Sequence, residues 1–140
     1  MGDGLLAVFP IEGVDGAKTA AMAAVTAARE ALVRLDRLNA EAPTPLDTFE
    51  GWKPLRTGIA LHEGEVFFGN IGAPERLDFT VIGSAVNEAS RVEALQKTLG
   101  RSLLITEAAA RHLDIPLDNL GEHSLRGVEG RLRIFSPSAP

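Results

Sequence analysis

The chain of 140 residues contains no cysteine, so disulfide bonds and metal sites built from thiolates are excluded. It also has no run of the roughly 20 apolar residues that a helix needs to cross a bilayer. Its first four residues (MGDG) lack the basic stretch with which a secretory signal begins. These absences favour a cytoplasmic protein, or the cytoplasmic part of a protein that a preceding segment anchors in a membrane.

The motifs of several large enzyme classes are also missing. Neither the G-x-x-x-x-G-K-[ST] loop that cradles phosphates nor the G-x-G-x-x-G turn of dinucleotide-binding proteins occurs. Ser84 and Ser90 do not stand in the context of a nucleophile elbow, and no Ser-His-Asp grouping stands out. The net charge of -5 argues against general nucleic-acid binding, which uses a basic surface. A single nucleoside triphosphate remains compatible with this charge, because a divalent cation can neutralise the ligand locally.

The residues that are present describe one folded domain. Hydrophobic residues make up 45% of the chain, and the mean hydropathy is near zero, as in globular proteins. A chain of this length can bury a substantial core. We assign residues 1–136 to the domain and residues 137–140, which include Pro137 and Pro140, to a C-terminal tail.

Hydrophobic spacing predicts a mixture of strands and helices. Apolar residues recur every three or four positions over residues 17–38, which predicts a long packing helix. A second helix is expected from residue 85 to residue 99, and a short one after Thr106 as N-cap. Short apolar and β-branched runs predict strands at residues 5–9, 77–82, 103–105 and 132–135, and two more within residues 55–72.

The connections between these elements indicate the fold class. Glu63 and Gly64 are expected to form a turn between the two strands of residues 55–72, and Gly100 is expected to end the second helix. Residues 115–119 are expected to form a loop, because Pro116 disfavours a continuing helix. Hairpins mixed with helices are typical of an α+β fold with a mostly antiparallel sheet.

Residues 77–93 join the clearest strand to the clearest helix start. Ser84, after Gly83, is a candidate N-cap. On the helix that follows, Asn87 and Arg91 stand four positions apart, which places both on one side. A carboxamide and a guanidinium side by side can hold a sugar oxygen and a phosphate. Spacing alone is also explained by two ordinary solvated helix residues, which is the commoner case.

Residues 78–91 (DFTVIGSAVNEASR) resemble the signature segment of class III nucleotidyl cyclases, the adenylate and guanylate cyclase catalytic domains. Three more segments resemble parts of this family in the same order: residues 1–9 the metal-binding hairpin, residues 57–72 the central glycine-rich hairpin, and residues 120–128 the loop before the last strand. Four ordered matches are far more specific than any one of them. The resemblance implies a ferredoxin-like core whose first strand-and-helix unit, with an Asp ligand and a purine-reading Lys, is missing from this sequence.

The resemblance also implies a reaction, in which the ribose 3′-hydroxyl of a nucleoside triphosphate attacks the α-phosphate and pyrophosphate leaves. Two Mg²⁺ or Mn²⁺ ions held by paired carboxylates would activate the hydroxyl and balance the phosphate charge. By position, Asp3 matches a metal ligand, Asn87 the residue that orients the ribose, and Arg91 the one that stabilises charge at the α-phosphate. Thr80 matches the purine-reading position, where Asp or Thr goes with adenine. Arg126 matches a phosphate-contacting position that more often holds Lys.

Several of these residues also have a plainer explanation. Asp3 precedes a glycine, and Asp-Gly is common at turns for backbone reasons alone. Arg126 is also explained as a surface arginine in a loop. His62 stands beside an expected turn, but no second His or Cys lies near it in the sequence, so a metal role for it is not favoured.

In this family the metal carboxylates come from one domain and most nucleotide contacts come from its partner, so the implied site forms only in a dimer. The hairpin at residues 57–72 is implied to contribute to this pairing. We therefore expect an adenylate cyclase catalytic domain that converts ATP to cyclic AMP and pyrophosphate in a homodimer. No nucleic-acid partner is expected, and membrane association only through a preceding region. The alternative is a non-catalytic cyclase-like module that dimerises or binds nucleotide, which the missing first unit favours for this chain alone.

Overall fold

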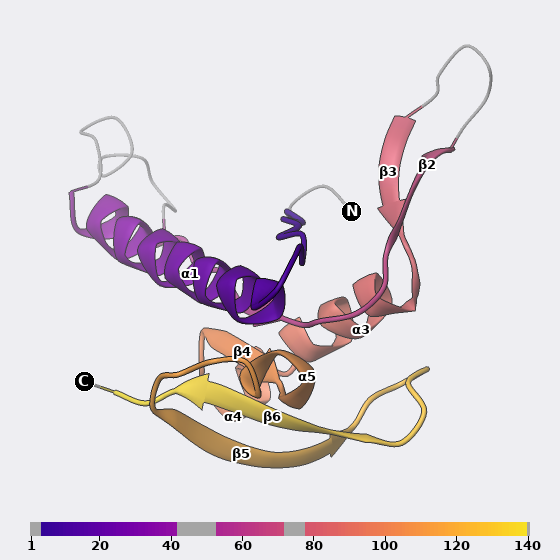
Figure 1. The fold of residues 1–140 in the computed structure, drawn as a ribbon. Coiled ribbons are helices and arrows are strands. Elements are labelled where there is room, and N and C mark those ends of the chain that lie inside the picture. Colours follow the sequence, from indigo (N-terminus) through magenta and orange to yellow (C-terminus); the bar gives the residue numbers. More distant parts are fainter. Residues whose placement is uncertain (1–3, 42–52, 72–77, 140) are drawn as a thin grey trace.

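The computed structural model describes residues 4–41, 53–71 and 78–139 (Figure 1). Runs of strands and runs of helices follow one another along the chain, which confirms the predicted α+β class. The elements are α1 (Gly16–Ala40), β1 (Ile59–Leu61), β2 (Phe67–Ile71), β3 (Asp78–Ile82), α3 (Ser84–Glu93), α4 (Gln96–Leu99), β4 (Leu103–Thr106), α5 (Glu107–Ala110), β5 (Leu117–Ser124) and β6 (Arg131–Pro137). Across the described ranges, no helix is long and apolar enough to span a membrane.

A four-stranded sheet with the spatial order β1-β4-β6-β5 forms the centre of the fold. β1 and β4 are parallel, whereas β6 pairs antiparallel with both β4 and β5. β2 and β3 form a separate antiparallel ribbon, which projects away from the sheet in Figure 1. The strand pairing is thus mostly antiparallel, as predicted.

Alternation along β4 divides the core between the two faces of the sheet. Leu103 and Ile105 pack with Val25 of α1, while Leu104 between them packs with Val92 of α3. Helix α1 therefore covers one face of the sheet and α3 covers the other. All five side chains are buried, so both helices are held by apolar contact.

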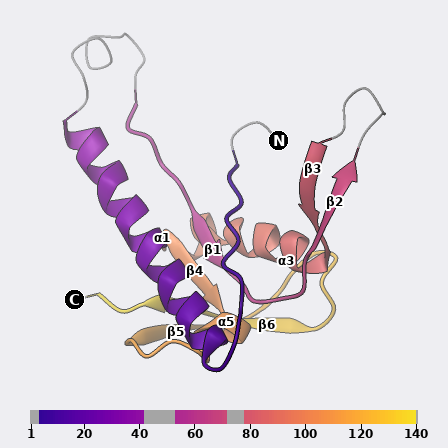
Figure 2. The ribbon, with the colours of Figure 1, turned by 45° about the horizontal axis from the view of Figure 1, so that its top comes forward.

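The long helix predicted over residues 17–38 is confirmed as α1. Val25 in its N-terminal half is buried, but Val33 and Leu38 farther along are exposed. Figure 2 shows the C-terminal half of α1 continuing past the sheet. Its end is held by Asn39, whose Nδ2 donates to the Leu55 carbonyl while the Leu55 N–H donates to Asn39 Oδ1, both at 2.8 Å.

Two predictions of strand pairing are wrong. Residues 5–9 form no strand with any described residue, and Leu5 is 96% exposed. The two strands expected within residues 55–72 exist, but no hairpin joins them at Glu63 and Gly64, because β1 pairs with β4 and β2 pairs with β3. The alternation of side chains indicates which residues favour a strand. Which strands pair depends on where another strand has backbone N–H and C=O groups available for hydrogen bonding.

The predicted loop at residues 115–119 is also wrong, because β5 begins at Leu117, directly after Pro116. A proline cannot donate to a sheet ladder, so it is tolerated beside the first residue of a strand. β6 extends as far as Pro137, and beyond it the Ser138 N–H donates to the Pro116 carbonyl at 3.0 Å. Gly100 has the left-handed conformation, with φ of 67°, and ends a helix as predicted, but the single helix predicted over residues 85–99 is divided into α3 and α4.

Candidate functional site

Helix α3 lies against the segment that contains β1. A Cβ added to Gly58 would lie 2.6 Å from Gln96 Cγ, and a Cβ added to Gly64 would lie 2.5 Å from Ala85 Cβ. Gly58, the first of the two glycines, lies at Gln96 in α4, whereas Gly64 lies at Ala85 near the start of α3. The helices α3 and α4 therefore run antiparallel to this segment. The two backbones approach this closely because neither glycine carries a side chain.

The start of α3 is set by backbone geometry. Gly83 takes the N-cap position with φ of 140°, and Ser84, predicted as the N-cap, is the first residue inside the helix. A side chain at Gly83 would be strained at this φ, and its Cβ would lie 3.1 Å from the Glu65 carbonyl oxygen. The prediction for Ser84 is therefore wrong by one residue. The N-cap position has a backbone conformation that favours glycine, so Gly83 occupies it in place of a residue with a capping hydroxyl.

His62, directly after β1, links α3 to the sheet. Its side chain is 7% exposed, with Nε2 2.7 Å from Glu88 Oε2 on α3 and Nδ1 2.8 Å from Thr106 Oγ1 at the end of β4. A carboxylate only accepts hydrogen bonds, so the Nε2–H donates to Glu88. The Thr106 hydroxyl can donate to Nδ1 or accept from it. Both ring nitrogens of His62 are thus occupied by protein partners.

Asn87 and Arg91 lie on α3 one helical turn apart, as predicted from their spacing, and both are exposed. Neither side chain forms a hydrogen bond or an ion pair with any residue that the structure describes. Val92, next to Arg91, is completely buried, and Glu88, next to Asn87, faces His62. One side of α3 is therefore fixed on the sheet, and another presents an amide and a guanidinium to solvent.

Thr80 lies in β3, the strand that leads through Gly83 into α3. Its backbone is paired opposite Gly69 of β2. The ribbon formed by β2 and β3 exposes three large apolar side chains, with Phe67 57%, Phe68 56% and Ile82 43% accessible. Exposed apolar side chains gathered on one element are typical of a protein contact surface.

Arg126 is exposed in the turn between β5 and β6, where the Val128 N–H donates to the Leu125 carbonyl at 3.1 Å. Leu125 is buried in the same cluster as Val92 of α3. The residues that precede Arg126 and follow Arg91 therefore share one apolar cluster. This packing brings the turn and α3 to the same part of the molecule.

Asp3, the predicted metal ligand, lies outside the described residues. Within residues 4–41, 53–71 and 78–139, no three His, Cys, Asp or Glu side chains are grouped so that they could hold a metal ion. The role of Asp3 as a metal ligand therefore stays a prediction.

The arrangement of α3, β3 and the sheet can be compared with known proteins. A sequence model of the adenylate and guanylate cyclase catalytic domain matches residues 2–136. The chain belongs to this family. An adenylate cyclase of Anabaena cylindrica is 38% identical over 134 residues, which are 96% of this chain and 24% of that protein. Adenylate cyclase 1 of Rhizobium meliloti is 36% identical over 111 residues, which are 78% of this chain and 16% of that protein.

The cyclase domain thus spans a quarter or less of the length of these relatives. Its fold also matches solved cyclases. The adenylyl cyclase CyaB from P. aeruginosa aligns with a TM-score of 0.62 and 25% identity over 92% of this chain and 62% of that chain. A bacterial light-regulated adenylyl cyclase aligns with a TM-score of 0.64 and 24% identity over 86% of this chain and 33% of that chain. The cyclase fold expected from the sequence is therefore confirmed.

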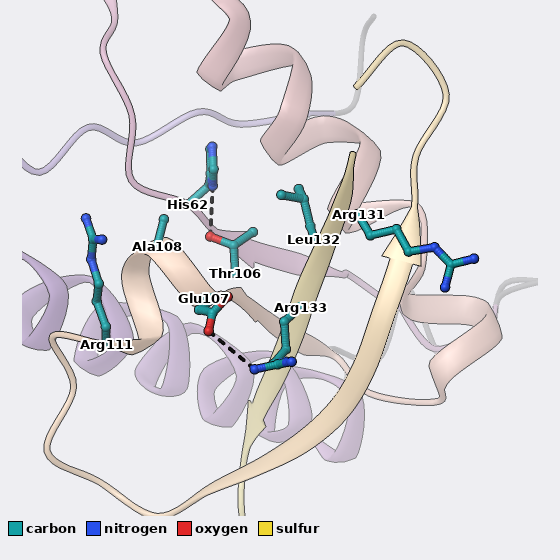
Figure 3. Close-up of a pocket in the computed structure, with 8 residues that line it drawn as sticks. All are labelled: His62, Thr106, Glu107, Ala108, Arg111, Arg131, Leu132 and Arg133. Atoms are coloured by element: carbon teal, nitrogen blue, oxygen red, sulfur yellow. Dashed lines mark hydrogen bonds and ion pairs between the residues drawn. The ribbon is translucent and has the colours of Figure 1, made fainter. Parts of the chain in front are cut away.

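The cyclase domain also has a cleft of about 390 Å³ between α5 and β6. Figure 3 shows Arg133 directed toward Glu107, with 3.5 Å between Nη1 and Oε1. The predicted nucleotide-contacting residues are not among those that line this cleft, which are His62, Thr106, Glu107, Ala108, Arg111, Arg131, Leu132 and Arg133. The predicted site of the cyclase domain is instead the open surface of α3.

Sequence reasoning missed the contacts that dock α3 in this cyclase domain. The sequence points to His62 only as a possible metal ligand and assigns no role to Glu88. The available signal was the pair of glycines on either side of β1, Gly58 and Gly64, because a glycine in or beside a strand often marks the close approach of another backbone.

Proposed function

We propose that this cyclase domain, within the protein that contains it, converts ATP to cyclic AMP and pyrophosphate at a site shared by two such domains. The observation that best supports the proposal is the exposed pair on α3, Asn87 and Arg91, which no described residue engages. Two relatives named as adenylate cyclases support the choice of reaction.

The chemistry requires groups of the kind that α3 presents. When the ribose 3′-oxygen bonds to the α-phosphorus and pyrophosphate leaves, negative charge develops on the α-phosphoryl oxygens. The guanidinium of Arg91 can stabilise this charge through charge-assisted hydrogen bonds. The carboxamide of Asn87 can both donate to and accept from ribose oxygens and so orient the sugar. Divalent ions would supply activation of the hydroxyl when bound, and we assign Asp3 to them as one ligand.

We assign the base and the remaining phosphate contact to two more residues. The Thr80 hydroxyl can accept a hydrogen bond from the adenine amino group, which favours ATP over GTP. Arg126 carries a cation on the turn that shares an apolar cluster with α3, and a cation there suits the terminal phosphates. The exposed apolar side chains of the β2–β3 ribbon support a homodimer, because their burial against a second copy would remove them from water.

The test uses the full-length natural protein with Mn²⁺ and equal concentrations of ATP and GTP, and it quantifies both cyclic nucleotides. We expect more cyclic AMP than cyclic GMP. Arg91→Ala should lower kcat for ATP about a hundredfold and change KM by less than about threefold, because the guanidinium acts on charge that develops in the transition state. Lys97→Ala, which removes another exposed cation just beyond α3, is the matched control and should leave kcat unchanged.

Equal changes in kcat and KM, or no change in either, would contradict the assignment of Arg91. Tight ATP binding by the wild-type protein without any cyclic nucleotide would instead support the alternative of a non-catalytic nucleotide-binding module.

A further inference from the structure

We propose that His62 and Glu88 form a positioning pair that fixes the rotation of α3 about its axis and thereby the direction of Asn87 and Arg91. The kinetic consequence of this inference rests on the proposed cyclase function, whereas its structural consequence does not. Neither His62 nor Glu88 is assigned any contact with the nucleotide.

Glu88 lies on the same helix as Asn87 and Arg91, so its orientation and theirs change together when α3 rotates. Successive helical residues are separated by about 100° around the axis, so Glu88 lies about 100° from Asn87 and, as its i, i+3 neighbour, about 60° from Arg91. Any rotation of α3 that breaks the 2.7 Å contact between Glu88 Oε2 and His62 Nε2 therefore turns Asn87 and Arg91 through the same angle.

The pair is anchored in the sheet. His62 is 7% exposed, and its Nδ1 is held at 2.8 Å by the hydroxyl of Thr106, which is buried at the end of β4. Apolar packing of Val92 holds α3 against the sheet, but such packing has no preferred direction. A hydrogen bond does have a preferred direction. The chain from Glu88 through His62 to Thr106 is thus a directional link between α3 and the sheet.

The next residue provides a matched control. Glu63 Oε2 lies 2.7 Å from His112 Nε2, with side chains 25% and 24% exposed, and Glu63 Oε1 lies 3.7 Å from Arg111 Nη2, so this second carboxylate also pairs with an imidazole at the same length. His112, however, follows α5 rather than belonging to α3. Removing the Glu63–His112 pair should therefore disturb the fold to a similar degree without changing the orientation of α3.

Glu88 is the position to change, because removal of the nearly buried His62 ring would leave a cavity. Glu88→Ala removes the acceptor. Glu88→Gln keeps the side-chain length and an oxygen that can accept the proton of His62 Nε2. If geometry rather than charge positions α3, Glu88→Gln should behave like the wild type.

The first readout is the rate of cyclic AMP formation by the full-length protein. Glu88→Ala should lower kcat about tenfold to a hundredfold with KM within about threefold, because a small misplacement of reacting groups is costly. Glu88→Gln and Glu63→Ala should both stay within about threefold of the wild-type kcat. An equal loss in Glu88→Ala and Glu63→Ala, or a Glu88→Gln protein as slow as Glu88→Ala, would overturn the proposal.

The second readout is amide hydrogen exchange of the same samples without nucleotide. Glu88→Ala should raise exchange rates in residues 86–93 about tenfold, whereas Glu88→Gln and Glu63→Ala should not raise them. Unchanged exchange of α3 in Glu88→Ala would overturn the positioning role. A wild-type protein that makes no cyclic nucleotide would refute the proposed function alone, and exchange would then decide the positioning pair by itself.

Discussion

Replacing Gly64 with alanine should push α3 away from the segment after β1. The added Cβ would lie 2.5 Å from Ala85 Cβ and 3.6 Å from its Cα. Carbon atoms that are not bonded to each other attract best at about 3.5–4.0 Å, so the first contact is about 1 Å too short. Ala85 is buried in the first turn of the helix and cannot rotate out of the way, so one of the two backbones has to move.

The size of the effect follows from two opposing contributions. Overpacking of a filled site costs about 1–3 kcal/mol. Alanine also restricts the unfolded chain more than glycine does, which raises the free energy of unfolding by about 0.4–1 kcal/mol. This gain applies here because Gly64 is not among the glycines with positive φ, so alanine can adopt its backbone conformation. From the middle of each range, Gly64→Ala should lower the free energy of unfolding by about 1 kcal/mol. Adding Ala85→Gly removes the opposing methyl group, so the double variant should be about 1–3 kcal/mol more stable than the sum of the two single changes predicts.

Urea unfolding followed by circular dichroism measures all three variants. Gly69→Ala is the control, because a Cβ added there has no atom within 4 Å, and it should not destabilise the protein. A Gly64→Ala protein as stable as the wild type would refute the close packing of α3 on this segment. So would single changes that add within about 0.5 kcal/mol in the double variant.

Two further predictions concern polar contacts at the edges of the fold. Hydrogen bonds from Ser138 first, and then from Arg101, hold the pKa of Asp118 below its ordinary value of 3.8. These bonds therefore stabilise the fold at pH values above the pKa of Asp118 in the unfolded chain, and the stabilisation is lost as the pH falls through its pKa in the folded protein. In urea unfolding, the free energy by which the wild type exceeds Asp118→Asn should shrink below about pH 4. A difference that stays constant with pH would contradict this. Asn39→Asp should lower the unfolding free energy by about 1 kcal/mol, because the Leu55 carbonyl loses its donor and faces a carboxylate; an unchanged urea midpoint would contradict this.

The elements that the sequence predicts best are those determined by local pattern. The apolar stripe of α1 follows from helical spacing, and the structure confirms that helix within two residues at its C-terminal end. The positions of Asn87 and Arg91 on one exposed side of α3 follow from the same periodicity. Gly100 is predictable as a helix end because the left-handed conformation there suits glycine.

Features that depend on a distant partner were predicted poorly. The sequence predicts a hairpin turn at Glu63 and Gly64 because hairpin signals are local, but β1 pairs with the distant β4, Ile59 opposite Leu103, whereas β2 pairs with β3, the strand that follows it. Gly64 instead makes room for α3, and the neighbouring His62 bonds to Glu88 and Thr106, 26 and 44 residues away. No local pattern reports contacts of this separation, so the docking of α3 required coordinates.

The central claim is that two copies share one site, with Asp3 from one copy and Arg91 from the other. The most direct test mixes full-length Asp3→Ala and Arg91→Ala proteins, each of which should be nearly inactive alone. After subunit exchange at equal concentrations, about half of the dimers are mixed and each of these has one intact site, so we predict recovery of about a quarter of the wild-type activity. A mixture that stays inactive although subunit exchange is demonstrated would contradict the shared site.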